Sequence, residues 1–215
     1  MNNIKSIIFD FDGTLHDTME IYYPAFKKGI NHLKKHGIAE EYEVTRENIS
    51  TFLGEKPSYA YDLIAKDAPD ELKLETQKLV GFEMEKYMED GTGRLYPNTV
   101  EVLDKLCKKY DLYILSNARD IYLDKALKVY KIEKYFRRAY AAESFDYIPK
   151  DKILEKIIPN MEPDVIFVGD RFHDINAAVS NNIKSIFCTY GFGKIHEGDK
   201  ANYKIDSIEE ILKIL

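Results

Sequence analysis

Two short segments of the sequence carry pairs of aspartates at spacings that suit a bound cation. Asp10 and Asp12 belong to the run Asp-Phe-Asp-Gly-Thr-Leu, and Asp170 and Asp174 lie four residues apart after a second apolar run. Carboxylates gathered closely repel one another unless a cation lies among them, and hard oxygen ligands suit Mg²⁺. If the fold brings both segments together, these four residues predict a magnesium site.

Each aspartate pair also has an ordinary structural explanation. Asp12-Gly13 is typical of a turn after a strand, and a carboxylate such as Asp174 in the first turn of a helix suits the helix dipole. The two-residue period of a strand would direct Asp10 and Asp12 to the same face. Neither pair alone therefore distinguishes a turn or helix start from a site.

Two further segments add a hydroxyl and a cation. Ser116-Asn117 follows another apolar run, and Lys150 follows Pro149 where a helical pattern begins. The Ser116 hydroxyl and nearby backbone N–H groups would hold phosphoryl oxygens, or the pair would cap the next helix. A cation in a first turn opposes the helix dipole, although Lys150 also fits a solvated surface position. Facing Asp10, this lysine would cancel charge between the carboxylate and an incoming phosphate.

The elements that position these residues follow an α/β pattern. Short β-type apolar runs alternate with helix-period segments, and runs that are apolar on both parities indicate strands buried on both faces. The alternation predicts a Rossmann-like doubly wound parallel sheet, which binds ligands beyond the carboxyl ends of its strands. The expected strands are 4–10, 111–117, 165–170 and 185–190, and the expected helices are 99–109, 121–130 and 152–158.

One stretch breaks the alternation, because only helices are predicted from Asp17 to about Asp90. About 70 residues of helix would make an unusual crossover, so an inserted all-helical cap subdomain is the more economical explanation. We expect a core of 1–16 and 94–215 and a helical cap of 17–93. The expected cap helices are 22–33, 45–53, 59–65 and 71–88.

The composition indicates an acidic, well-solvated globular chain. It has 215 residues, with 31 Lys+Arg against 37 Asp+Glu and a formal net charge of −6. Nucleic acids and anionic membranes attract an excess of basic residues, so we expect neither as a partner. The first apolar stretch ends at Asp10, too early for a signal peptide or a membrane span. We expect a cytoplasmic protein and, by default, a monomer.

The ordered set of motifs resembles the haloacid dehalogenase (HAD) superfamily over essentially the whole chain. The motifs are Asp10-Phe11-Asp12-Gly13-Thr14-Leu15, Ser116-Asn117, Lys150 and Gly169-Asp170-x3-Asp174. The helical insertion after the first motif resembles the cap of the phosphoglycolate phosphatase and β-phosphoglucomutase-like branch. Asp151 follows the lysine where many members have proline, a departure that concerns the start of the helix more than the chemistry.

This resemblance implies a phosphatase that acts on a small phosphorylated metabolite. Asp10 would be the nucleophile and form an aspartyl-phosphate, and Asp12 would be the general acid and base. Ser116, the Asn117 backbone and Lys150 would bind the transferring phosphoryl group.

The resemblance also implies Mg²⁺ as the cofactor. The ion would be held by the Asp10 carboxylate, the Asp12 backbone carbonyl and Asp170. Asp174 would act through a water molecule or support the other ligands.

Two other functions fit part of the pattern. A phosphomutase of the β-phosphoglucomutase type carries a cap histidine where we place Tyr22, which favours a phosphatase. A phospho-accepting signalling domain also gathers aspartates, a hydroxyl and a lysine around Mg²⁺. In that class the accepting aspartate lies well into a chain of about one ordinary domain, and there is no cap, so the position of Asp10 and the helical insertion argue against it. Within the cap, Lys56 and Tyr22 are candidate substrate contacts, with an exposed turn lysine and a packed tyrosine as the alternatives.

Overall fold

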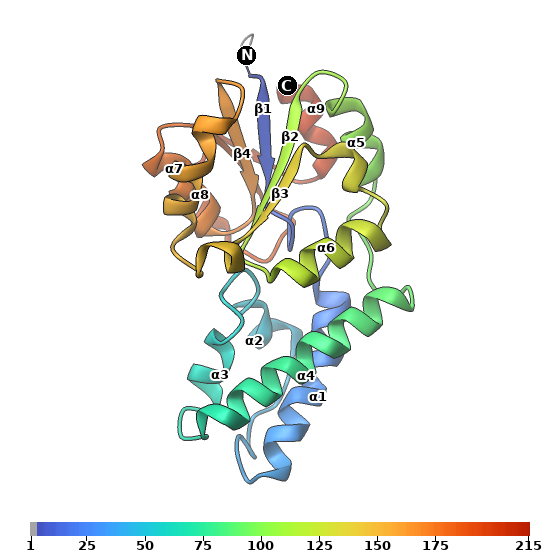
Figure 1. Cartoon of the computed structure of the whole chain (residues 1–215), viewed down its shortest axis with the longest axis vertical. Coiled ribbons are helices and arrows are strands. Elements are labelled where there is room, and N and C mark those ends of the chain that lie inside the picture. Colours follow the sequence, from blue (N-terminus) through green and yellow to red (C-terminus); the bar gives the residue numbers. More distant parts are fainter. Residues whose placement is uncertain (1–3) are drawn as a thin grey trace. The chain divides into compact units, whose positions relative to one another are not determined.

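The computed structural model describes residues 4–215 and divides into two compact units (Figure 1). One unit contains the residues up to Asp17 together with Leu95–Leu215, and the other is Thr18–Arg94. The boundaries expected from the sequence, 16/17 and 93/94, each lie one residue away from these divisions.

The first unit is built on a six-stranded parallel sheet, which confirms the predicted fold class. The strand order is β3-β2-β1-β4-β5-β6, so the chain proceeds outward from β1 in both directions. Doubly wound sheets bind ligands at this point, beyond the carboxyl ends of the strands. The strands are β1 Ser6–Phe9, β2 Asp111–Ser116, β3 Arg138–Ala141, β4 Val165–Gly169, β5 Lys184–Cys188 and β6 Tyr203–Ile205.

Helices cover both faces of this sheet, with α7 and α8 on one face and α5, α6 and α9 on the other (Figure 1). The α-helices are α5 Thr99–Leu106, α6 Asp120–Val129, α7 Lys150–Ile157, α8 Phe172–Ser180 and α9 Ile211–Ile214. Short 3-10 turns are η1 Glu133–Tyr135, η2 Ala142–Phe145, η3 Ile158–Asn160, η4 Ile195–Gly198 and η5 Ile208–Glu210. Nowhere between residues 4 and 215 is a helix both long and apolar enough to span a membrane.

A hydrophobic cluster fills the space between the sheet and helices α7 and α8. It includes Ile8 of β1 and Phe167 of β4, which are fully buried, with Leu154 of α7 and Ala178 of α8. Side chains alternate between the two faces of a strand, so Ile8 fixes which residues of β1 point toward α7 and α8.

The sequence pattern does not predict β3 and β6, which form the two edges of the sheet. β3 begins with the exposed Arg138, and β6 has three residues, of which Ile205 is buried. An edge strand pairs on one side, so it lacks the continuous apolar run by which a central strand is recognised.

The second unit contains α1 Met19–Lys35, α2 Arg46–Ser50, α3 Tyr59–Ile64 and α4 Asp70–Glu89, with no strand in the range 18–94. The two long helices, α1 and α4, pack against each other at a glycine. A Cβ atom at Gly29 of α1 would collide with Cγ2 of Val80 and would lie 3.3 Å from Cγ2 of Thr76, both on α4. The absence of a side chain at Gly29 therefore permits this close helix contact.

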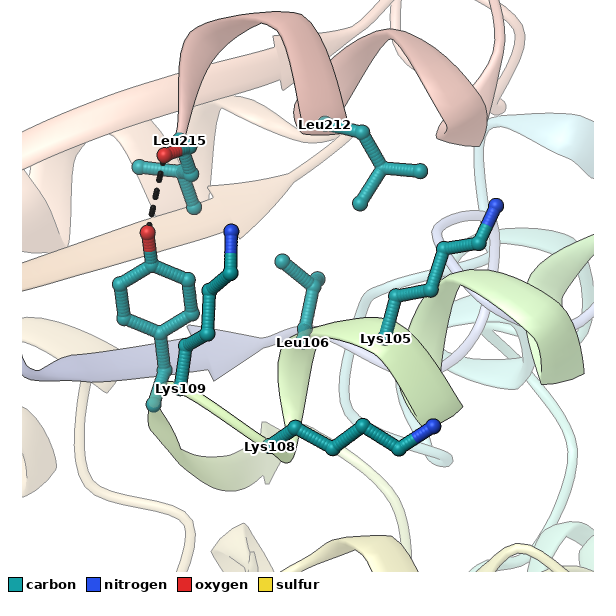
Figure 2. Close-up of a pocket in the computed structure, with 7 residues that line it drawn as sticks. Lys105, Leu106, Lys108, Lys109, Leu212 and Leu215 are labelled. Atoms are coloured by element: carbon teal, nitrogen blue, oxygen red, sulfur yellow. Dashed lines mark hydrogen bonds between the residues drawn. The ribbon is translucent and has the colours of Figure 1, made fainter.

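A cavity of about 380 Å³ lies between the end of α5 and the C-terminal residues (Figure 2). Leu106, Leu212 and Leu215 line it together with three lysines. The Tyr110 hydroxyl donates a 2.9 Å hydrogen bond to the carbonyl oxygen of Leu215. Because Tyr110 directly precedes β2, this cavity is at the amino edge of the sheet, opposite the carboxyl ends of the strands.

We predict that Gly29→Ala lowers the free energy of unfolding, measured by chemical denaturation. Alanine favours helix by about 1 kcal/mol over glycine, but overpacking typically costs about 1–3 kcal/mol, so we expect a net loss. Val80 is β-branched and has little rotamer freedom with which to yield. Lys27→Ala, at an exposed position of the same helix, is the control and should change stability little.

The Val80→Ala background supplies the second test of this contact. There the collision is removed, so adding Gly29→Ala should cost less or should stabilise the protein. An equal loss in both backgrounds would show that the Gly29–Val80 approach does not limit the packing of α1 on α4.

Candidate active site

The carboxyl ends of β1 and β4 bring three buried aspartates together. Asp10 follows β1, Asp170 follows β4, and Asp174 lies in the first turn of α8. Their side chains each offer an oxygen atom, and these atoms all lie within 4.8 Å of one another. The three residues are between 0% and 3% exposed. We call Asp10, Asp170 and Asp174 the carboxylate cluster.

Lys150 links two members of the carboxylate cluster. Its ammonium group donates to Oδ1 of Asp10 at 2.9 Å and to Oδ1 of Asp174 at 2.6 Å. Lys150 is the first residue of α7 and is 5% exposed, so it is not a solvated surface lysine. Asp10 lies two positions after Ile8, which explains why its side chain meets residues of α7 and α8.

Other donors hold both oxygens of Asp170 and the second oxygen of Asp174. Asp170 accepts the Phe192 backbone N–H at Oδ2, at 2.7 Å, and the Thr14 hydroxyl at Oδ1, at 3.2 Å. Oδ2 of Asp174 accepts the backbone N–H of Arg171 at 3.0 Å. These contacts orient both carboxylates from within the loops that follow the strands.

The segment Gly191-Phe192-Gly193 can approach Asp170 because glycines flank Phe192. A Cβ atom at Gly191 would collide with the Asp170 side chain, and one at Gly193 would collide with the Asp170 backbone oxygen. The turn after β5 thus supplies a backbone donor to the carboxylate cluster.

Burial and mutual repulsion disfavour negative charge on the carboxylate cluster. Burial raises the pKa of Asp10 well above its ordinary value; Lys150 opposes this effect, and Asp174 and Asp170 add to it. Burial and Asp174 raise the pKa of Asp170 to about 7. Burial alone would lower the pKa of Lys150, but Asp10 and Asp174 raise it above its ordinary value, so the lysine remains charged.

The donor set of the cluster fits a divalent cation. The Lys150 ammonium contacts two of the three carboxylates, so its single positive charge leaves two negative charges in excess within the cluster when all three are ionised. Their oxygens are hard ligands of the type that Mg²⁺ prefers. A bound divalent cation would balance these charges and favour ionisation of Asp10 and Asp170.

Asp12 belongs to a different group of side chains. Its Oδ1 accepts the Tyr122 hydroxyl of α6 at 2.8 Å and lies 3.4 Å from Nδ1 of His16. The strand-based expectation that Asp12 and Asp10 share a face is wrong, because β1 ends at Phe9 and the chain then turns. Asp10 is held by Lys150 of α7, and Asp12 by Tyr122 of α6.

Ser116 and Asn117 occupy the carboxyl end of β2, the strand next to β1. Ser116 is buried, and its hydroxyl oxygen accepts the N–H of Ala118 at 3.2 Å. Helix α6 begins at Asp120 with Arg119 as its N-cap. The helix-capping alternative for Ser116-Asn117 is therefore wrong, and the serine instead stabilises the turn between strand and helix.

The two candidate substrate contacts, Tyr22 and Lys56, lie in the second unit. Tyr22 of α1 has its ring 5.2 Å from that of Phe26, and burial raises the pKa of its hydroxyl well above the ordinary value. Lys56 is exposed in the turn that precedes α3. Their contact with a substrate stays a prediction.

The sequence motifs assign no role to several residues of the site: Thr14 lies within the first motif, and Tyr122 and Phe192 lie outside all four. Thr14 and the Phe192 backbone contact Asp170, and Tyr122 contacts Asp12. A hydroxyl on the otherwise apolar face of a helix that follows Ser116-Asn117 is the signal that would have pointed to Tyr122. A backbone N–H such as that of Phe192 cannot be recognised from residue types. The glycines on either side of Phe192 are the only sequence sign that the chain approaches another group closely there.

Comparisons with known proteins show what the chain is similar to. It is 25% identical to "Pyrophosphatase PpaX" of Bacillus mycoides, covering 99% of this chain and 97% of that protein. It is 24% identical to "Phosphoglycolate phosphatase" of Vibrio parahaemolyticus, covering 99% and 96%. A crystal structure described as a predicted phosphoglycolate phosphatase from Haemophilus somnus has the same fold, with a TM-score of 0.87 and 22% identity, over 100% of this chain and 99% of that one.

The family model described as "Haloacid dehalogenase-like hydrolase" matches residues 7–188. The match extends across β1, the whole second unit and all the strands up to β5. Because it covers most of the chain and includes the segments that carry the carboxylate cluster and Lys150, this protein belongs to the haloacid dehalogenase-like hydrolase family.

Proposed function

We propose that this phosphatase uses Mg²⁺ and an aspartyl-phosphate at Asp10 to hydrolyse a small phosphate monoester. The observation that carries the proposal is Lys150, buried between Asp10 and Asp174 beside Asp170. Buried ion clusters contribute little net stability, and strongly shifted pKa values gather at functional sites. The family membership and the similarity to a pyrophosphatase and a phosphoglycolate phosphatase support hydrolysis of a phosphorylated substrate.

In the first step, a carboxylate oxygen of Asp10 attacks the phosphorus atom and forms the aspartyl-phosphate. The bond from phosphorus to the leaving oxygen breaks, and that oxygen takes the proton of the Asp12 carboxylic acid. The alcohol then leaves, and Asp12 is a carboxylate.

In the second step, the Asp12 carboxylate takes a proton from a water molecule. The water oxygen attacks phosphorus, and the bond from phosphorus to the Asp10 oxygen breaks. Inorganic phosphate leaves, and both aspartates return to their starting states. Asp12 therefore serves as acid in one step and as base in the next.

Phosphoryl oxygens are bound by the Ser116 hydroxyl, the Asn117 backbone N–H and Lys150, which oppose the negative charge of the group in transfer. Mg²⁺ would be held by the Asp10 and Asp170 carboxylates and the Asp12 backbone carbonyl, with Asp174 in support. When bound, the ion neutralises charge between the phosphate dianion and the carboxylate cluster. The net charge of −6 favours a small diffusible ester over a polyanion.

We predict that Asp10→Asn lowers kcat on p-nitrophenyl phosphate by about 10³-fold or more, because an amide cannot replace the nucleophile. Phosphate release is the measurement, and Asp124→Asn, at an exposed position of α6, is the matched control. Mass spectrometry of the acid-quenched wild-type enzyme should find phosphate on the peptide that contains Asp10.

Two results would contradict this part of the proposal. An Asp10→Asn variant that keeps most of its activity would remove Asp10 as the nucleophile. One stable phosphorylation per chain without turnover would favour the signalling class of protein over the phosphatase.

We predict that chelation of divalent metal lowers the rate by about 10²-fold or more, because a bound ion supplies several kcal/mol of charge stabilisation. The measurement is p-nitrophenyl phosphate turnover in excess EDTA, followed by titration with Mg²⁺. Restored activity with an unchanged circular dichroism spectrum is expected. An undiminished rate in EDTA would exclude the proposed cofactor.

A further inference from the structure

Asp12 contacts a hydrogen-bonded set of side chains that has no role in the mechanism proposed above. The Tyr122 hydroxyl donates to Oδ1 of Asp12 at 2.8 Å, and Nδ1 of His16 lies 3.4 Å from the same oxygen. On the far side of the imidazole, Nε2 of His16 lies 2.7 Å from the Tyr130 hydroxyl. We call Tyr122, His16 and Tyr130 the Asp12 support.

The Asp12 support is fixed by packing as well as by hydrogen bonds. His16 is fully buried and stacks on the ring of Phe11 at 5.2 Å between centroids, with an interplanar angle of 15°. The Tyr122 ring meets the same phenylalanine edge-on at 6.4 Å. Phe11 is thus held on one side by the turn that contains His16 and on another by α6.

The two tyrosines of the support come from one helix. Tyr122 lies in the first turn of α6, and Tyr130 caps its C-terminal end. Burial and the Asp12 carboxylate raise the pKa of Tyr130, so its hydroxyl keeps its proton and can donate it to Nε2 of His16. In the tautomer in which Nε2 accepts, Nδ1 carries the single ring proton and faces Asp12.

We propose that Tyr122 is a positioning residue for Asp12, supported by His16 and Tyr130, and that it holds the carboxyl group in the orientation that protonates the leaving oxygen. This inference rests on the proposed function, in which Asp12 is the acid and base.

The geometry explains how one hydroxyl can set this orientation. Tyr122 and His16 both approach Oδ1, so they restrict the rotation of the carboxyl group. Proton transfer to the leaving oxygen then proceeds from Oδ2, as the P–O bond breaks and the electron pair stays on the oxygen. The Tyr122 hydrogen bond strengthens as Asp12 becomes a carboxylate, so it stabilises the product of this transfer.

The test compares two substrates that differ in their need for the proton. Phenyl phosphate has a poor leaving group that requires protonation, whereas 2,4-dinitrophenyl phosphate has a good one that does not. The value of kcat/KM reports the reaction through cleavage of the substrate, before the common aspartyl-phosphate is hydrolysed. A defect in the acid should therefore lower kcat/KM for phenyl phosphate selectively.

We predict that Tyr122→Phe lowers kcat/KM on phenyl phosphate by about 10-fold or more, the effect of one hydrogen bond to a charged group, and on 2,4-dinitrophenyl phosphate by less than about 3-fold. Tyr110→Phe is the matched control, because it removes a hydroxyl that donates to Leu215 at the opposite edge of the sheet. It should leave both values unchanged.

Asp12→Asn separates failure of this inference from failure of the proposed function. It should lose about 10²–10⁴-fold on phenyl phosphate and much less on the dinitrophenyl ester, as a general acid does. If it shows no such selectivity, the role of Asp12 is wrong and the inference fails with it. If Asp12→Asn is selective but Tyr122→Phe affects both substrates equally, or neither, Tyr122 is structural and the inference alone is overturned.

Tyr130→Phe provides a second variant if Tyr122→Phe does not fold. It removes the hydroxyl next to Nε2 of His16 without touching Asp12. We expect a smaller loss with the same selectivity for phenyl phosphate. Equal effects on both esters would overturn the supporting role of His16 and Tyr130.

Discussion

The contact of Lys150 with Asp10 and Asp174 is the interaction on which the site depends. Without a cation, the fold would bury three adjacent carboxylates at the ends of its central strands, at a cost of several kcal/mol for each ion. Lys150 supplies one charge, and backbone N–H groups near Asp170 and Asp174 supply partial ones. The remaining negative charge is what makes this place attractive to a divalent cation, so the same arrangement limits stability and enables binding.

The doubly wound sheet separates the two aspartates of the first motif into different surroundings. Asp10 continues the alternation of β1 and meets the ammonium of Lys150 on the α7 and α8 side. Asp12 lies beyond the end of the strand and meets the Tyr122 hydroxyl of α6 and the His16 imidazole. A nucleophile must stay ionised, whereas an acid and base must gain and lose a proton. Two residues of separation across a turn place Asp10 beside Lys150, which opposes the rise in the Asp10 pKa caused by burial, and place Asp12 beside hydroxyl and imidazole groups.

Much of this arrangement follows from the sequence, because it depends on short-range patterns. Central strands have continuous apolar runs, and polar residues at their carboxyl ends must gather at one edge of a parallel sheet. The pattern of residues alone is therefore enough to place Asp10 and Asp170 at the same edge, whereas the position of Lys150 beside Asp10 is implied by the family resemblance. It is not enough for the edge strands β3 and β6, since pairing on one side leaves no strong pattern. The predicted direction of the Asp12 side chain is also wrong, because strand periodicity does not extend into a turn.

The surroundings of Asp12 could not be predicted because they join residues that are distant in the chain. Tyr122 lies 110 residues from Asp12, and Tyr130 lies 114 residues from His16. The second unit is inserted between these segments, so sequence spacing says nothing about their contact. The helix period predicts which residues of α6 face the sheet, but not which of these side chains contacts Asp12. A motif can identify Asp12 by its position, whereas its contacts with Tyr122 and His16 become visible only when α6 is packed on the sheet.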